Sequence, residues 1–205
     1  MKRFLAVLGA MLIATAAAAQ GGAQYTELNP RLPLVADDEG KIEVVEFFWY
    51  GCPHCYDLEP QVEQWKKTLP PGAVFRPYPA VFNAQWAHDA SIFFTFEALG
   101  VLDKLHRPFF DAIHIDHLRT DDPRALDAWV KKQGLDPKKF EATRKSFSVQ
   151  AKTRRAAQLT AAYKIDGTPA FAVAGRYTVS VEQGRNFEGM MRTVSSLVDM
   201  IQKGK

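Results

Sequence analysis

Two adjoining segments decide the fold: VVEFF at residues 44–48, followed by GCPHC at residues 51–55. The first segment is β-branched or aromatic apart from one acid, which is typical of a largely buried strand. The second holds the only two cysteines of the 205-residue chain. Because Pro53 suits the first position of a helix, we expect Cys52 at the helix start and Cys55 one turn further in. The sequence therefore predicts two thiols where a strand gives way to a helix.

This placement of a C-x-x-C pair is typical of thiol-disulfide exchange on a thioredoxin-like fold. A purely structural disulfide is the alternative. A bridge that closes so short a loop would constrain the unfolded chain very little. With 47% hydrophobic residues and 14 Phe, the chain can also bury a large core without a bridge. We therefore interpret both cysteines as redox-active.

The N-terminus has the pattern of a secretory signal peptide. Two positive charges precede an apolar run at residues 4–14, and Ala17-Ala18-Ala19 offers a cleavage site. An uncleaved membrane anchor is the alternative, but the apolar run is short for a membrane span. Cleavage after residue 19 removes Lys2 and Arg3 and no acid, so the formal net charge falls from +3 to +1. Such a signal places the mature protein in the bacterial periplasm or outside the cell, where disulfides persist.

The mature part gives no support for two other classes of protein. It contains no long run of Lys or Arg, and its aromatic residues are placed as core residues, so nucleic-acid binding is not indicated. No second apolar run reaches membrane-spanning length.

The pattern along the chain predicts an α/β domain with an insertion. A strand at 42–49, a helix at 53–69 and a strand at 73–82 come first, and Pro77 and Pro79 place the second strand at a sheet edge. Helical periodicity then continues without a strand through five segments, and a hairpin near 170–181 and a helix at 187–202 follow. We predict a thioredoxin-like domain from residues 20–83 and 164–205, with an all-helical insertion at 84–163.

Cys52 is the candidate nucleophile, since the unpaired N–H groups at a helix start favour a thiolate there. Cys55 is expected to be buried and to act as the resolving cysteine. His54 can place a positive charge or a hydrogen-bond donor near the thiolate. Stabilising the thiolate favours the reduced dithiol and makes the disulfide a stronger oxidant. An exposed helix residue without a role is the alternative for His54.

Glu46, Glu59 and Glu43 are among the acids near the dithiol in the sequence. Glu46 interrupts the buried strand, so its pKa should be raised and it can pass a proton to or from Cys55. An acid that faces solvent or pairs with a lysine is the alternative. Glu59, four residues after Cys55, either extends this relay or is a surface acid. Glu43 lies on the opposite face of the strand and is expected in solvent.

A proline precedes the C-terminal hairpin in the run DGTPA at residues 166–170. Pro169 would open a strand opposite the dithiol. If its peptide bond is cis, the backbone of Thr168 is free to pair with an extended substrate. From local sequence alone, a trans proline in a turn is the default.

Taken together, these features resemble the DsbA family of bacterial periplasmic thiol:disulfide oxidases over essentially the whole mature length. The resemblance is carried by Glu46-Phe47-Phe48, by Cys52-Pro53-His54-Cys55-Tyr56 with Glu59, by the helical insertion and by Gly167-Thr168-Pro169-Ala170. It implies that Cys52 is the nucleophile, Cys55 the resolving cysteine, and His54 the chief stabiliser of the thiolate. It also implies a cis Pro169 and a buried Glu46.

The resemblance further implies reduced, newly exported polypeptides as substrates and a DsbB-type membrane oxidase as the reoxidising partner. We expect no metal or other cofactor besides the redox-active disulfide. The chain departs from the family pattern at two places. Thr168 stands where the best-known members carry Val, and the basic residue that many members place after the active-site helix is replaced near Pro77, with Arg76 the closest candidate.

Two other functions compete with this interpretation. A reductase or isomerase similar to the DsbC or DsbG type would be a dimer with an added N-terminal domain, but only about 20 residues precede the first long strand of the mature chain, which favours a monomeric oxidase. A metal-binding module would need further ligands beside Cys52 and Cys55, which are half a structural zinc site. The remaining candidates lie in the helical insertion: His88, His106, and the pair His114 and His117, which would share a helix face.

Overall fold

The computed structural model describes residues 24–36 and 40–204. The predicted signal peptide at residues 1–19 lies outside this range. Five strands form one sheet in the order β1-β5-β4-β2-β3, in which β2 and β3 are parallel and the other neighbours antiparallel. The strands are β1 (Thr26–Glu27), β2 (Ile42–Phe48), β3 (Ala73–Pro79), β4 (Ala170–Val173) and β5 (Tyr177–Ser180).

β2 lies inside the sheet and β3 at its edge, as the sequence predicts. All residues of β2 after Ile42 are buried, which explains why this strand reads as a nearly continuous apolar run. Pro77 and Pro79 are tolerated in β3 because an edge strand has one side without ladder partners. In the register, Glu46 of β2 lies between Pro77 of β3 and Phe171 of β4.

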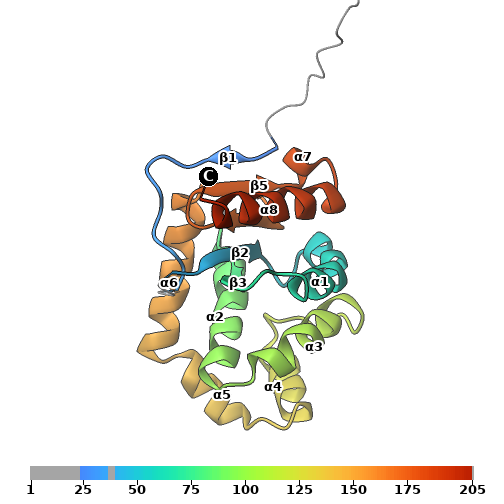
Figure 1. Ribbon diagram of the computed structural model, residues 1–205. Helices are drawn as coiled ribbons and strands as arrows, with labels where there is room; N and C mark the ends of the chain where they lie inside the picture. The colour runs from blue at the N-terminus through green and yellow to red at the C-terminus, as the bar shows by residue number, and fades with distance from the viewer. Residues whose placement is uncertain (1–23, 37–39, 205) are drawn as a thin grey trace, which may run out of the picture.

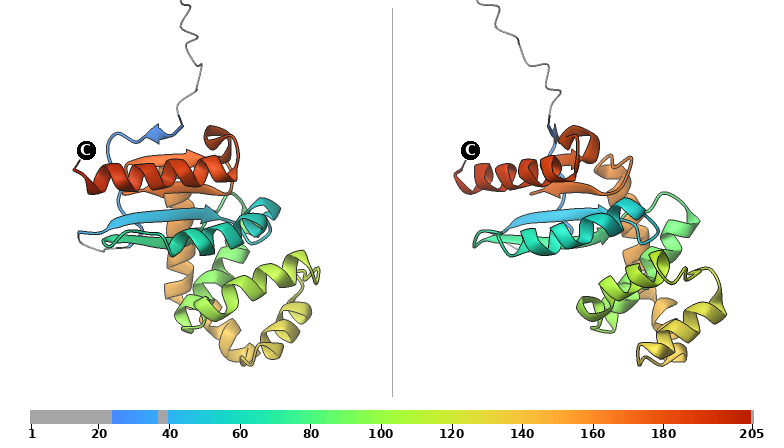
Figure 2. Two further views of the ribbon diagram at one scale, coloured as in Figure 1. Left: turned by 45° about the vertical axis from the view of Figure 1, so that its right-hand side comes forward. Right: turned by 90° about the vertical axis from the view of Figure 1, so that its right-hand side faces the viewer.

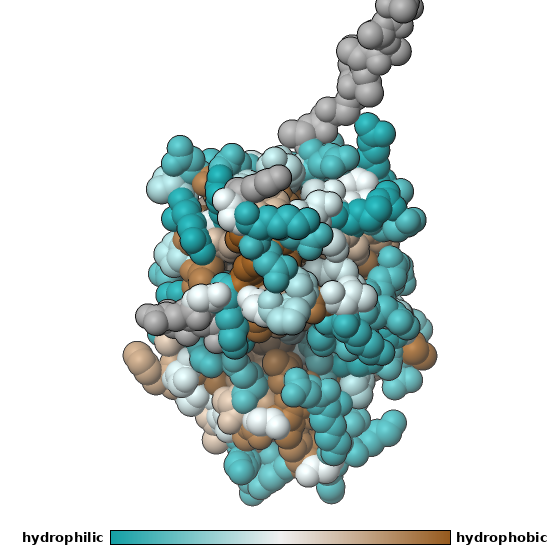
Figure 3. Space-filling model, viewed as in Figure 1, coloured by the Kyte–Doolittle hydropathy of each residue, from teal (hydrophilic) through white to brown (hydrophobic). Residues whose placement is uncertain are grey.

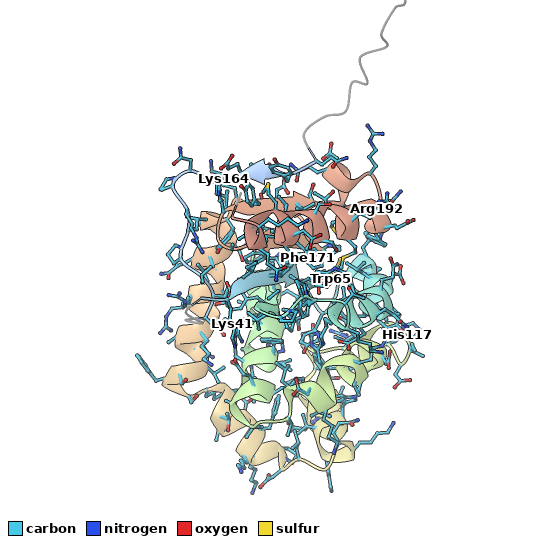
Figure 4. All side chains as sticks on the ribbon, viewed as in Figure 1. Lys41, Trp65, His117, Lys164, Phe171 and Arg192 are labelled. Atoms are coloured by element: carbon cyan, nitrogen blue, oxygen red, sulfur yellow. The ribbon has the colours of Figure 1, made fainter. Side chains whose placement is uncertain are left out.

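Helices cover both faces of the sheet (Figures 1 and 2). On one face, α1 (Pro53–Lys66) and α8 (Phe187–Gln202) pack on apolar side chains of the strands. Trp65 of α1 meets Phe171 of β4 there, with ring centroids 6.3 Å apart (Figure 4). The opposite face carries Val45 and Phe47, which belong to the core that the remaining long helices complete. Because successive side chains of β2 point to opposite faces of the sheet, this strand contributes to the apolar cores on both faces.

Between β3 and β4 the chain forms five helices: α2 (Ala84–Ala98), α3 (Leu102–His114), α4 (Pro123–Lys132), α5 (Pro137–Arg144) and α6 (Phe147–Ala162). Asp122 and Asp136 cap α4 and α5 with Pro at the first helical position, as predicted. Figure 2 shows α3, α4 and α5 beyond the edge of the sheet, while α6 runs back to it. Aromatic rings of Phe96, Phe109 and Trp129 pack in the interior of this group.

The predicted order of elements is confirmed, with small differences. The short strand β1 and the single-turn helix α7 (Val181–Gly184) were not predicted, and α1 ends at Lys66 rather than near residue 69. The boundaries of the two domains remain a prediction. Among the described residues, the helices are too short or too polar to cross a bilayer. On the face seen in Figure 3, polar residues alternate with smaller apolar areas.

The prediction that Glu43 faces solvent is wrong. Glu43 does lie on the face of β2 opposite Glu46, but it is only 1% exposed. Its two carboxylate oxygens accept hydrogen bonds of 2.9 Å from the backbone N–H groups of Val35 and Ala36. Arg76 of β3 lies 3.5 Å from the same carboxylate. The segment that precedes β2 covers Glu43, and strand alternation alone cannot reveal such a cover.

We predict that Glu43→Ala destabilises the protein by about 1–3 kcal/mol, because two partly buried backbone N–H groups lose their acceptor. The control is Glu63→Ala, which removes an acid of a largely exposed ion pair with Lys66 and should change the free energy of unfolding by less than about 1 kcal/mol. Urea denaturation of both variants measures the difference. Equal stabilities of the two variants would contradict the role given to Glu43.

Candidate active site

The start of helix α1 brings the two cysteines together. Cys52 is the N-cap residue with an extended backbone, Pro53 occupies the first turn, and Cys55 follows within that turn. Both cysteines are free, so the structure represents the dithiol form. Cys55 is fully buried, whereas Cys52 retains 7% of its accessible surface. The expected difference in exposure is present, although Cys52 is more covered than the sequence suggested.

Hydrogen bonds lower the pKa of Cys52 to about 5. The largest cause is a hydrogen bond with the thiol of Cys55, and burial works in the opposite direction. The side chain of Thr168 and the backbone N–H groups of Cys55 and His54 add to the lowering. These N–H groups are the unpaired donors of the first helical turn. At neutral pH, Cys52 is therefore a thiolate, the reactive form in disulfide exchange.

His54, the second residue of α1, lies near the start of α8. Its side chain is exposed, and its ring lies 6.0 Å from the ring of Phe187 in α8, measured between centroids. The group of His54 that lowers the pKa of Cys52 in this structure is the backbone N–H. A contribution of the imidazole remains a prediction.

Thr168 and Pro169 lie opposite the dithiol, as expected from the resemblance. The bond between them is cis. In its protonated form, the thiol of Cys52 donates a hydrogen bond of 3.4 Å to the carbonyl oxygen of Thr168. Residues separated by more than a hundred positions in the sequence therefore form one site. A second cis bond, between Asn29 and Pro30, was not indicated by the sequence.

Burial dominates the chemistry beneath the dithiol. It raises the pKa of Cys55, and the neighbouring charges of Cys52 and Glu46 add to this effect. Burial also raises the pKa of Glu46 well above its ordinary value, with a further contribution from Glu59. Glu46 is 1% exposed, and no described residue forms a hydrogen bond with its carboxyl oxygens. The predicted burial and raised pKa of Glu46 are confirmed.

Glu59 is buried as well, with 5% of its surface exposed, so it is not a surface acid. Its Oε1 atom lies 3.6 Å from Nε2 of His106 in α3. The Nδ1 atom of His106 is in turn 2.9 Å from the hydroxyl of Tyr50. Arg76, the basic residue expected nearest to the relay, instead lies beside Glu43.

His106 and Tyr50 are residues of this region that the sequence analysis did not assign to the site. Tyr50 stands two residues before Cys52, and His106 follows the buried Leu105 and precedes the buried Phe109 and Phe110 by three and four residues. This helical spacing places His106 on the edge of the apolar face of α3. The sequence thus indicates that His106 borders the apolar face of α3, but it does not show that α1 packs against that border.

The histidines considered as metal ligands have other positions. His114 ends α3, lies 2.8 Å from the carbonyl oxygen of Tyr50 and stacks on Tyr56. His117 lies beyond the helix end with a positive φ of 56°, at the periphery in Figure 4. His114 and His117 therefore do not share a helix face, the arrangement that the metal-binding alternative would have used. Within residues 24–36 and 40–204, no three His, Cys, Asp or Glu side chains form a group suited to a metal ion.

Comparison with known proteins places this site in a family. The family model of the DSBA-like thioredoxin domain matches residues 75–190. The thiol:disulfide interchange protein DsbA of Bordetella parapertussis is 44% identical over 199 residues, which cover 97% of this chain and 94% of that protein. The DsbA of Azotobacter vinelandii is 35% identical over 206 residues, covering 94% and 95% of the two chains.

Solved structures agree with the sequence matches. The crystal structure of Pseudomonas aeruginosa DsbA superimposes with a TM-score of 0.82 at 33% identity and covers 89% of this chain and 94% of that chain. The oxidoreductase NmDsbA1 of Neisseria meningitidis gives a TM-score of 0.75 at 30% identity, with 89% and 94% covered. With its thiolate-forming cysteine at the start of α1 and its fold shared with these proteins, the chain belongs to the DsbA family of thiol:disulfide oxidoreductases.

Proposed function

We propose that the protein is a periplasmic oxidase that donates its Cys52–Cys55 disulfide to reduced, newly exported proteins. The observation that carries this proposal is the lowered pKa of Cys52, about 5. A stabilised thiolate favours the reduced form of the enzyme, so its disulfide tends to pass to other thiols. The family name of the relatives supports the same chemistry.

The proposed reaction has two exchange steps. A substrate thiolate attacks the sulfur of Cys52, the Cys52–Cys55 bond breaks, and Cys55 leaves as a thiolate that takes up a proton. A second thiolate of the substrate then attacks the substrate sulfur of the mixed disulfide. This step forms the substrate disulfide and releases Cys52 as a thiolate. Two electrons pass from substrate to enzyme. A thiol of low pKa is a good leaving group, so Cys52 suits the second step.

The side chains around the dithiol support distinct roles in this reaction. The exposed Pro53 and His54 lie beside Cys52, where a substrate arrives. The backbone of Thr168, whose carbonyl oxygen lies 3.4 Å from the sulfur of Cys52, can pair with an extended substrate segment as an added strand would. Glu46, with Glu59 as its neighbour, exchanges a proton with Cys55.

Regeneration needs an external oxidant, because each turnover leaves the enzyme as a dithiol. We propose a DsbB-type membrane oxidase for this step, in agreement with the family and with the predicted signal peptide. The Cys52 thiolate would attack a disulfide of that partner, and Cys55 would then close the enzyme disulfide. The mature enzyme acts as a monomer in this proposal and uses no metal or other cofactor.

The lowered pKa of Cys52 can be measured directly. Titration of the reduced protein, followed by thiolate absorbance, should show Cys52 ionising near pH 5, far below the roughly 8.5 of a free cysteine. His54→Ala should raise this midpoint if the imidazole adds to the stabilisation. A wild-type midpoint near that of a free cysteine would refute the mechanism, while an unchanged midpoint in His54→Ala would show that the imidazole has no part in the stabilisation.

Thr168→Val should also raise the pKa of Cys52, because the Thr168 side chain supplies one of the hydrogen bonds that lower it. Thr168→Ser retains a hydroxyl group and should keep the wild-type midpoint. The same thiolate titration measures both variants. If the valine and serine variants titrate alike, the hydroxyl has no part in the stabilisation.

Redox equilibration with glutathione tests the direction of the reaction. We expect the protein to be mostly reduced in buffers that leave thioredoxin oxidised, since the thiolate stabilises the dithiol form. This stabilisation is present above the ordinary pKa of a thiol and disappears as the pH falls through about 5, where Cys52 takes up its proton. A potential close to that of thioredoxin would favour a reductase and overturn the proposal.

A further inference from the structure

We propose that His106 is the solvent-side end of the path by which the buried Cys55 gains and loses its proton, acting through Glu59 and Glu46. The inference rests on the proposed exchange function of the dithiol. His106 touches no reacting atom in this view; it is a proton-relay residue whose effect reaches Cys55 through the two acids.

Cys55 cannot exchange a proton with water directly. It is fully buried, and Cys52, with which it forms the disulfide, is itself only 7% exposed. In a mixed disulfide the partner is bonded to the sulfur of Cys52 and covers the surface of Cys52 further. The proton must therefore travel through the protein on another side.

Glu46 provides the first step of such a route. It lies on the face of β2 that α1 covers, and α1 carries Cys55 and Glu59 one turn apart. Its charge is coupled to the charges of both groups. Its two oxygens have no hydrogen-bond partner among the described residues, so neither oxygen is committed to a structural contact. A neutral carboxyl group in this position can receive a proton on one oxygen and release its own from the other. Since Glu46 is itself buried, the route must continue through Glu59.

His106 lies where the route from Glu59 would continue. Its Nε2 atom is 3.6 Å from Oε1 of Glu59, just beyond direct hydrogen bonding. This nitrogen is buried and has no hydrogen-bond partner within the described part of the chain. A small rotation of either side chain would bring the two atoms into hydrogen-bond contact. The ring is held for this contact from its other side, because Nδ1 is 2.9 Å from the hydroxyl of Tyr50.

Tyr50 allows His106 to change its protonation state in place. A tyrosine hydroxyl can donate to an unprotonated Nδ1 and can accept from a protonated one. Burial raises the pKa of Tyr50, with the charge of Glu59 adding to the effect, so the hydroxyl keeps its own proton. The imidazole can therefore hold or release a proton at Nε2 without losing its anchor at Nδ1.

Beyond His106 the path reaches a cavity of about 860 Å³ at the free edge of β3. Both Glu59 and His106 line this cavity, together with parts of α1, α2, α3 and α6. Helices α1 and α3 lie side by side here (Figures 1 and 2). Of the described residues at the dithiol, Cys52, Cys55 and Thr168 are not among those that line it. The His106 side chain, 13% exposed, thus stays in contact with the cavity while a partner covers Cys52; because Nε2 itself is covered, this nitrogen meets the cavity water when the ring turns.

The test separates the two steps of reoxidation with oxidised glutathione. In the first step the Cys52 thiolate forms a mixed disulfide with glutathione. In the second step Cys55 loses its proton and attacks the sulfur of Cys52, which closes the enzyme disulfide and releases glutathione as a thiolate. Acid quenching and mass spectrometry of the intact full-length mature protein measure how much of each species is present over time.

His106→Gln should slow the second step by about tenfold or more, the scale of general acid–base contributions, and leave the first step unchanged. The mixed disulfide then accumulates. Glu59→Gln should have the same effect, and the double variant should be no slower than the slower single variant, because both residues lie on one path. His114→Gln is the matched control: it changes a histidine of the same helix that also contacts Tyr50, and it should close the disulfide at the wild-type rate.

A second variant distinguishes proton transfer from packing. His106→Ala opens onto the existing cavity, so added imidazole should restore the second step, whereas pyrazole, of the same shape but a much weaker base, should not. Rescue by both compounds or by neither contradicts the inference, as does a wild-type closing rate in His106→Gln. If the unmodified enzyme forms no mixed disulfide at all, the proposed function itself fails, which is a different result from a normal first step with an unchanged second one.

Discussion

The stabilisation of a thiolate at the N-terminus of α1 is the interaction on which the rest of the structure depends. A negative charge on Cys52 is tolerated in a nearly covered position because N–H groups of the first turn and the thiol of Cys55 point to it. The helix must begin at this residue, and the loop around the cis Pro169 must reach it from across the sheet. The buried strands β2 and β4, which are direct neighbours, bring these two segments together.

The same arrangement has a cost in free energy, because it buries two ionisable groups beneath the dithiol. Placing Cys55 and Glu46 in the core separates both groups from water, and burial raises the pKa of each. A core of this kind is less stable than one with an apolar residue at position 46. Such a group is commonly found where it serves the chemistry of a site. The contacts of Glu59 with His106, and of His106 with Tyr50, then connect the acids to the cavity beside β3.

Much of the site could be predicted from residues that are close in sequence. The spacing of Cys52 and Cys55, the proline between them and the strand before them fix which thiol is outside and which is inside. Glu46 was recognisable because it interrupts an apolar run. Glu43 was misjudged although it interrupts the same run, since its partners come from the segment before β2, which has no strong pattern. The sequence indicates His106 only as a possible metal ligand, because its neighbours Glu59 and Tyr50 lie on other segments of the chain.

The sequence by itself determined the order of the elements, the helical insertion and the redox chemistry of Cys52 and Cys55, because hydrophobic periodicity, helix caps and the reactivity of a thiol are local properties. The tertiary structure decided the contact of Thr168 with Cys52, the burial of Glu43 and Glu59 and the position of His106. Each of these depends on which surfaces meet when distant segments pack, and burial and hydrogen bonding then set the protonation of the groups that are enclosed.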